Sequence, residues 1–311
     1  MGEPKIILLC GGRIALPVLR DLFFYKQLAA IVIPAHCSDF IQQVQLLMKD
    51  SDMPVITVTK QNVLQKLQAA ISTYKPTMGL VFTFSYRLPE AIYTLPVQGF
   101  YNIHPGPLPA YRGPDPVFWQ IRNKEQYAAV SIHKVDDGFD TGPVVLSDKI
   151  HLNSTDTYGI LTTKLSELAT RLVGTLLRIA GFGMQIPSRP QDHSKACYYP
   201  RQLAVDISIN WQTMDADSIV ALIHACNPWN KGAVTKLDER IIRFLDAHVV
   251  SSAIEPASAG TIIGINENGI IISTIGDKLI CVGLIYTNEG FLMGNRLKDS
   301  GIIAGARFDA V

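Results

Sequence analysis

The chain has 311 residues, of which 48% are hydrophobic and 18% are charged, so it is long enough to bury the cores of two ordinary domains. The formal net charge of +1 supplies no overall basic field for binding nucleic acid. No run reaches the ~20 apolar residues of a membrane-spanning helix, and the five scattered cysteines form no CxxC pair. We therefore expect a soluble cytoplasmic protein without a disulfide framework, a metal site or a membrane partner.

The N-terminal part alternates short apolar runs with stretches of helical periodicity. Its first apolar run ends at a glycine pair, and apolar residues at helical spacing follow at once. This alternation predicts strands at 5–10, 29–33, 55–58, 79–84 and 128–134, and helices after the first strand and near 39–49, 63–74, 116–122 and 157–180. It is typical of a Rossmann-like, mostly parallel sheet with helices on both faces.

The C-terminal part has a different pattern. Glycines and prolines end the long helix, and a polar, extended stretch follows it. A short helix is predicted at 217–226, and β-branched runs separated by turns lie at 241–245, 260–265, 269–274 and 278–286. These runs predict a small antiparallel barrel. The expected domains are 1–183, a linker at 184–204, and 205–311.

Two polar segments that follow predicted strands carry the candidate functional residues. Asn102 and His104 are two residues apart, so an extended backbone directs both side chains to one face. They lie where a strand leaves the sheet, which is where open α/β sheets form their sites. Asp140 belongs to a second segment, 136–142, which holds three carboxylates and two glycines. We expect both segments to open onto one crevice.

These residues alone also fit plainer interpretations. The proline-rich stretch after His104 could be a rigid surface loop, and His104 could be a buried histidine whose hydrogen bonds are satisfied. Residues 136–142 could form a turn or a weak cation loop, although their spacing does not fit an EF-hand. Arg13 follows a glycine pair without the dinucleotide or P-loop pattern, and it could bind an anion or be solvated.

Two motifs together resemble the folate-dependent formyltransferase family, which includes methionyl-tRNA, glycinamide ribonucleotide and sugar N-formyltransferases. They are Asn-Ile-His-Pro-x-x-Leu-Pro-x-Tyr-Arg-Gly, which begins at Asn102, and Asp-x-Gly-x-Asp-Thr-Gly, which contains Asp140. The resemblance implies that Asn102, His104 and Asp140 are the catalytic trio. It continues through 191–200 and 225–229, which resemble the linker and the C-terminal domain of methionyl-tRNA formyltransferases, and it therefore implies an open, OB-like barrel.

The resemblance also implies a co-substrate, 10-formyltetrahydrofolate, and no metal. The folate site would be lined by Phe84, Tyr86, Arg87, Leu88 and Pro89, and closed over the pterin ring by Val135, Asp136, Asp137 and Gly138. Formyl transfer needs donors for the oxyanion of a tetrahedral intermediate, which protonated His104 and the Asn102 amide could supply. Asp140 beside the imidazole could raise its pKa and relay protons.

The sequence departs from the tRNA enzymes of this family near the acceptor side. Gly-Gly-Arg replaces the usual Gly-Thr-Pro after the first strand, and the long basic insertion after the second strand is missing, since no lysine or arginine lies between Lys26 and Lys49. Without that insertion the phosphate contacts that would hold a tRNA acceptor stem are lost. Candidate acceptor contacts are Gly12, Arg13, Pro107, Arg112 and Asp115.

Three functional hypotheses follow. The first is an N-formyltransferase whose acceptor is a small amine, such as an amino sugar, an amino acid derivative or a natural-product precursor. The alternative is a genuine methionyl-tRNA formyltransferase acting on the initiator tRNA, which would need a basic face on its C-terminal domain. That face could use Lys231, Lys236, Arg240, Arg243, Arg296, Lys298 and Arg307. The third hypothesis is a non-catalytic folate- or RNA-binding relic. The sequence leaves the acceptor and the oligomeric state open.

Overall fold

The computed structural model describes residues 4–251 and 257–311, and the chain divides into two compact units. The first unit comprises Met1–Pro116, Tyr127–Ile150 and Thr162–Tyr199, and the second comprises Val117–Gln126, His151–Leu161 and Pro200–Val311. Two excursions of the N-terminal part therefore count with the second unit. The domain boundaries expected from the sequence stay predictions.

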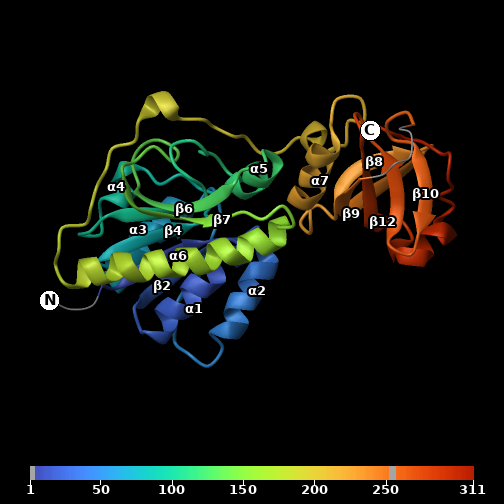
Figure 1. Ribbon diagram of the computed structural model, residues 1–311. Helices are drawn as coiled ribbons and strands as arrows, with labels where there is room; N and C mark the ends of the chain where they lie inside the picture. The colour runs from blue at the N-terminus through green and yellow to red at the C-terminus, as the bar shows by residue number, and fades with distance from the viewer. Residues whose placement is uncertain (1–3, 252–256) are drawn as a thin grey trace. The chain divides into compact units, whose positions relative to one another are not determined.

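The first unit is built on a seven-stranded sheet (Figure 1), in the order β3-β2-β1-β4-β5-β6-β7. The strands are β1 (Ile6–Cys10), β2 (Leu28–Pro34), β3 (Val55–Val58), β4 (Met78–Phe82), β5 (Phe100–His104), β6 (Tyr127–Lys134) and β7 (Val144–His151). Strands β1 to β5 pair in parallel, whereas β6 is antiparallel to β5. The predicted mostly parallel sheet is confirmed.

Helices connect these strands and supply much of the core. They are η1 (Arg13–Ala15), α1 (Leu16–Phe24), α2 (Ser38–Leu47), α3 (Val63–Tyr74), α4 (Glu90–Tyr93), α5 (Pro116–Arg122), α6 (Tyr158–Gly181) and η2 (His193–Lys195). Ile7 and Leu9 of β1 are fully buried and pack in one cluster with Leu67 of α3 and Ile92 of α4. Burial of these apolar side chains stabilises the packing of the helices on the parallel sheet. The carboxyl ends of its parallel strands are thereby held along one edge of the sheet.

Strand β7 was not predicted from the sequence. Only its first two residues, Val144 and Val145, are buried, and most of the others are exposed. It lies at the edge of the sheet. A half-exposed edge strand therefore lacks both the continuous apolar run and the regular alternation on which the prediction depends.

The second unit contains a curled antiparallel sheet, in the order β10-β11-β12-β9-β8-β14, with β13 paired to β12. Its elements are η3 (Ala204–Ile207), α7 (Ala216–Ala225), β8 (Ala233–Leu237), β9 (Arg240–Ser251), β10 (Ile262–Asn266), β11 (Gly269–Ser273), β12 (Lys278–Thr287), β13 (Gly290–Met293), η4 (Gly294–Ser300) and β14 (Phe308–Asp309). The backbone of Ile262 exchanges hydrogen bonds with residues 305 and 306 (2.8 Å each), and Phe308 donates to Gly260 (2.9 Å). These bonds join the two ends of the sheet, so the predicted small antiparallel barrel is confirmed.

The barrel core is aromatic. Trp211, Phe244 and Phe308 are fully buried and pack ring against ring, with centroids 5.1–6.4 Å apart. The indole Nε1 of Trp211 donates to Thr235 Oγ1 (3.0 Å), which satisfies its one polar group. In the described part of the chain, no helix is long and apolar enough to cross a bilayer.

Candidate active site

The register between β5 and β6 brings Asn102 and a second histidine together. Asn102 lies opposite His133 in this antiparallel pair, and His104 lies opposite Ser131. Opposite residues of such a pair project to the same face of the sheet. His133 was missed in the sequence analysis, although Ser131 and His133 are polar residues at alternate positions of an apolar strand, which is a signal that the face beside Asn102 is polar.

Asp140 is the point on which several segments converge. Its Oδ1 accepts a hydrogen bond from the Asn102 amide nitrogen (3.1 Å), and its Oδ2 accepts one from the backbone N–H of Gly113 (2.9 Å). The same Oδ1 lies 3.5 Å from His104 Nδ1 and 3.4 Å from His133 Nε2. The structure therefore brings Asn102, His104 and Asp140 together, as the spacing of the two motifs led us to expect.

The backbone of Asp140 adopts a left-handed conformation, with φ of 56°. Aspartate visits this region more readily than most residues, but it still costs conformational energy there. The turn directs the Asp140 side chain back toward β5. The location of this uncommon conformation at the point of convergence fits a functional position.

His104 is almost fully buried, with 4% of its surface exposed. Its Nε2 lies 2.6 Å from the carbonyl oxygen of Tyr111, which can only accept, so Nε2 carries a proton. Burial lowers the pKa of His104, while the charge of Asp140 and the Tyr111 carbonyl act in the opposite direction. A second proton on Nδ1 would face the Asp140 carboxylate.

Asp140 is held in its ionised form. Burial by itself would raise its pKa, but the charge of His104, the adjacent His133 imidazole and the N–H of Gly113 outweigh burial. The pKa of Asp140 therefore lies well below its ordinary value. At neutral pH the cluster contains a mostly buried carboxylate that faces two imidazoles.

The hydrogen bonds of His133 define its tautomer. His133 Nδ1 lies 3.0 Å from the carbonyl oxygen of Lys134, so Nδ1 carries the proton of the neutral ring. Its Nε2 then accepts from the Asn102 amide nitrogen at 3.0 Å. Both amide hydrogens of Asn102 are thus directed to protein groups, one to His133 and one to Asp140.

The two segments assigned to folate by resemblance lie next to each other. Arg87 donates through Nη2 to the carbonyl oxygen of Asp137, which links the segment after β4 to the segment after β6. Leu88 is buried in the core, and Phe84, Tyr86 and Val135 pack against the same cluster while remaining partly exposed. Pro89, Asp136 and Gly138 complete these segments, and Asp136 Oδ1 accepts from the Gly138 N–H (3.1 Å).

The candidate acceptor residues differ from one another in how exposed they are. Gly12 approaches Thr83 so closely that a Cβ atom would lie 3.1 Å from its hydroxyl, and Arg13 next to it is exposed. Arg13 lies 2.9 Å through Nη2 from the amide oxygen of Gln43, with that amide turned as its partners require. Arg112, by contrast, is only 8% exposed. It therefore lies inside the protein.

The guanidinium of Arg112 binds groups of its own chain. It donates to Gln191 Oε1 through Nη2 (2.8 Å) and Nε (3.2 Å), and Nη2 also lies 3.2 Å from His193 Nδ1. Pro107 accepts at its carbonyl from the N–H of Ala110 (3.0 Å), and Asp115 is half-buried. Within residues 4–251 and 257–311, no three His, Cys, Asp or Glu side chains form a group that could hold a metal ion.

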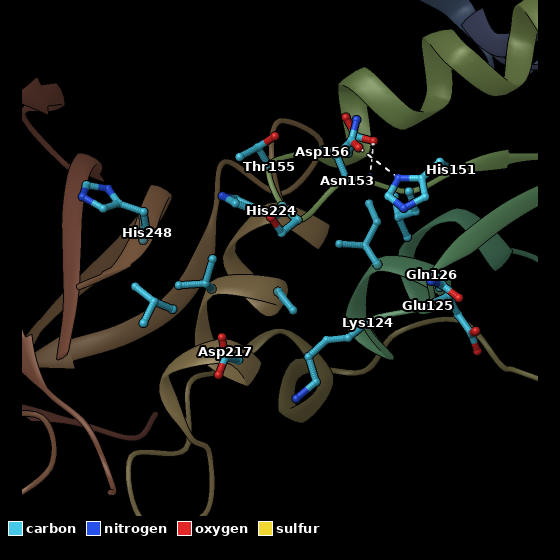
Figure 2. A pocket seen from close by; sticks show the side chains of 17 residues that line it. Lys124, Glu125, Gln126, His151, Asn153, Thr155, Asp156, Asp217, His224 and His248 are labelled. Carbon is cyan, nitrogen blue, oxygen red and sulfur yellow. Dashed lines mark hydrogen bonds between the residues drawn. The ribbon is translucent and has the colours of Figure 1, made fainter. Parts of the chain in front are cut away.

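A second polar region lies inside the second unit. It is a cavity of about 700 Å³. Figure 2 shows His151, His224 and His248 among the side chains that line it. His224 is buried, and its Nδ1 donates to the carbonyl oxygen of Ser154 (3.0 Å). Its Nε2 lies 3.9 Å from Asp246 Oδ1, beyond hydrogen-bond distance. Histidines and carboxylates therefore gather in both units.

Comparison with known proteins gives matches along most of the chain. The sequence profile described as Formyl transferase matches residues 38–176, and the profile described as Formyl transferase, C-terminal domain, matches residues 205–294. The methionyl-tRNA formyltransferase of Nitrosomonas europaea is 30% identical over 241 residues, which cover 76% of this chain and 72% of that protein. Against the corresponding protein of Kosmotoga olearia, also 30% identical, the aligned region spans 65% of the relative's length.

Solved structures share the fold. HypX from Aquifex aeolicus, in complex with tetrahydrofolic acid, superposes with a TM-score of 0.68 at 16% identity, covering 95% of this chain and 47% of HypX. The N-formyltransferase from Helicobacter canadensis, in complex with folinic acid and dTDP-3-aminofucose, superposes with a TM-score of 0.64 at 17% identity, covering 90% of this chain and 98% of that one.

Proposed function

The chain belongs to the formyl transferase family of enzymes, with both the N-terminal and the C-terminal domain of that family matched, and we propose that it moves the formyl group of 10-formyltetrahydrofolate to an amine. The observation that carries the proposal is the convergence of Asn102, His104 and His133 on the mostly buried carboxylate of Asp140. Phe84 and Tyr86 follow β4, the strand next to β5, and their partly exposed rings fit a planar pterin ring.

In this proposal the acceptor nitrogen attacks the formyl carbon, and a C–N bond forms while the bond from that carbon to the folate nitrogen breaks. His104, when protonated, stabilises the oxyanion that develops on the formyl oxygen. The proton that the amine loses passes, through water held by the Asp140 carboxylate, to the folate nitrogen as that nitrogen leaves. For Asn102 to bind the oxyanion as well, one of its amide hydrogens turns from His133 or Asp140 toward the substrate.

The proposed acceptor is a small amine. Strand β2 ends at Pro34 and helix α2 begins at Ser38, so only three residues lie between them. None of these three, Ala35, His36 and Cys37, is a lysine or an arginine. A connection this short lacks the reach and the charge to bind the phosphates of an acceptor stem, which argues for an acceptor held without backbone phosphate contacts.

Incubation with 10-formyltetrahydrofolate and a panel of amines tests this proposal. The panel contains a dTDP-amino sugar, free amino acids and methionyl-tRNA, and the product is detected by mass spectrometry. We expect formylation of a small amine and little or no formylation of the charged tRNA. Efficient formylation of methionyl-tRNA alone would contradict the small acceptor, and no formylated amine at all would contradict formyl transfer.

Methionyl-tRNA is the second candidate acceptor, and one feature of the barrel favours it. Arg243 of β9 lies opposite Tyr286 of β12, and Lys231 Nζ lies 4.7 Å from the centroid of the Tyr286 ring. The ring of Phe291 packs at 4.9 Å from Tyr286. Basic and aromatic side chains interleaved in this way suit a nucleic-acid backbone and bases. If tRNA is the acceptor, its binding weakens steeply as salt rises, and Arg243→Ala reduces that salt dependence.

A further inference from the structure

The stretch of chain after α6 is hydrogen-bonded to both loops of the candidate active site. We call residues 184–199 the return segment. Arg189 exchanges two backbone hydrogen bonds of 2.9 Å each with Val144, which follows the Asp140 loop. Farther along, Arg112 donates to the carbonyl of Cys197 (2.9 Å) and accepts from the N–H of Tyr199 (2.8 Å). The return segment therefore contacts the loop that follows His104 and the loop that carries Asp140.

Gln191 lies at the centre of the return segment and joins the two loops. Its Nε2 donates to the carbonyl oxygens of Asp140 (2.8 Å) and Gly142 (2.7 Å), and its Oε1 accepts from Arg112. The carbonyls only accept and the guanidinium only donates, so these partners fix the orientation of the amide. Gln191 is 8% exposed, and its two donors and its acceptor are all used. No other side chain type supplies two donors and an acceptor in this shape.

The contacts of Gln191 act on the backbone of Asp140, whereas Asn102 and Gly113 act on its carboxylate. Asp140 holds a left-handed conformation that it would leave readily if its carbonyl were released. Gln191 fixes that carbonyl, and through Arg112 it also fixes the residue next to Gly113. One amide thus holds both the Asp140 carbonyl and the residue next to Gly113.

We propose that Gln191 is a positioning residue for the transfer reaction, because it holds the Asp140 loop and the Arg112–Gly113 turn in the one arrangement that aims the Asp140 carboxylate at His104. The inference rests on the proposed formyl transfer. Under this inference Arg112 helps Gln191 to hold the two loops and does not bind the acceptor, since Arg112 donates to Gln191 and faces His193. A misplacement of a catalytic group by about 1 Å costs up to 10²-fold in rate.

The test compares Gln191→Glu and Gln191→Ala with the wild-type protein. Glutamate keeps the acceptor for Arg112 but cannot donate, so it sets a carboxylate against the carbonyls of Asp140 and Gly142. The assay uses 10-formyltetrahydrofolate and the amine that the panel identifies, and kcat is expressed per folinic acid binding site from a titration. We expect kcat per site to fall at least tenfold in both variants, with the KM for the folate changed less than threefold.

Asp192→Asn is the matched control, because Asp192 is exposed and its carboxylate contacts Ser194 and Lys195 of the return segment itself. Its kcat per site should stay within twofold of the wild type. Wild-type kcat per site in both Gln191 variants would overturn the inference, as would a loss explained wholly by a higher KM for the folate. Absence of transfer by the wild-type protein would instead overturn the proposed function, so the two failures are distinguishable.

Discussion

Histidines and carboxylates gather at two places in this protein, and their hydrogen bonds separate the two. Around Asp140, donors from β5 and from the turn at Gly113, together with the His133 imidazole of β6, face one mostly buried carboxylate. Around the cavity of the second unit, two histidines have partners of their own: His224 Nδ1 donates to the Ser154 carbonyl oxygen, and His151 Nδ1 lies 3.0 Å from Asn153 Oδ1. Figure 2 shows His151 beside Asn153. The first cluster holds a charge at one point, whereas the second distributes its polar groups around a hollow.

The difference shows that a polar cavity alone does not identify an active site. Asp217, on the wall of the second cavity, is neutralised by Lys278 at 2.7 Å, and both side chains are about half exposed. Asp140 has no lysine or arginine partner among the described residues and relies on imidazoles and N–H groups. A mostly buried carboxylate that stays ionised beside imidazoles favours their protonated forms, whereas an exposed ion pair contributes little.

The largest effect is expected from Asp140→Asn. The amide keeps the shape of the side chain but removes the charge that faces His104 and the carboxylate that holds the water through which the amine proton leaves. We expect kcat to fall by about 10³, because both the acid–base and the electrostatic contributions are lost. Steady-state kinetics with the accepted amine measure this change. A fall in kcat smaller than tenfold would contradict the view that the Asp140 cluster, unlike the cavity of the second unit, carries the reaction.

A smaller effect is expected from His133→Gln. Glutamine can still accept from the Asn102 amide, but it lacks the ring that fixes the alignment of Asn102 with Asp140. We expect kcat to fall about tenfold, as for a residue that positions others rather than reacting itself. Folinic acid binding, measured by calorimetry, serves as the control and should be retained. A loss as large as that of Asp140→Asn would instead place His133 among the reacting groups.

The stability of the protein should report the charge of Asp140 as pH changes. Its pKa is lowered in the folded state, so its ionised form stabilises the fold above the ordinary carboxyl pKa of about 4. That contribution is lost as pH falls through the lowered folded-state value. We therefore expect the difference in unfolding free energy between wild type and Asp140→Asn to shrink in acid. Urea unfolding at several pH values measures it, and a difference that grows in acid would contradict the assignment.

His224→Leu is expected to leave the reaction unchanged. The substitution removes the donor to the Ser154 carbonyl in the second unit. The loss of one buried hydrogen bond should cost about 1–3 kcal/mol of stability, visible as a lower thermal midpoint. We expect kcat per folate site to remain within twofold of the wild type. A tenfold loss of kcat without loss of folded protein would show that the second cluster takes part in the reaction.

Local patterns in the sequence predicted much of the fold. Alternating apolar runs located the strands of the parallel sheet, and the spacing of Asn102 and His104 placed both on one face of β5. The barrel was predicted from its turns, but its closure through Ile262 and Phe308 depends on backbone pairing between distant segments. Pairing between distant segments produces no local pattern in the sequence from which it could be predicted.

The residues missed around the site are those that tertiary contacts bring in. His133 reaches Asn102 through the register of two antiparallel strands, 31 positions apart in the chain. Gln191 reaches Arg112 across 79 positions, from a stretch that reads as a polar linker. His133 belongs to neither quoted motif. Gln191 begins the 191–200 stretch that resembles the family's linker, but its burial is visible only once the return segment lies on the loops.

The most direct test of the central claim is the fate of a labelled formyl group. 10-Formyltetrahydrofolate carrying ¹⁴C in the formyl group is mixed with the accepted amine and with wild-type protein or His104→Ala. We predict that the wild-type protein transfers the label to the amine and that His104→Ala lowers the rate of this transfer by at least about 10³. Both proteins should bind folinic acid. Equal transfer of label by the two proteins would contradict the account.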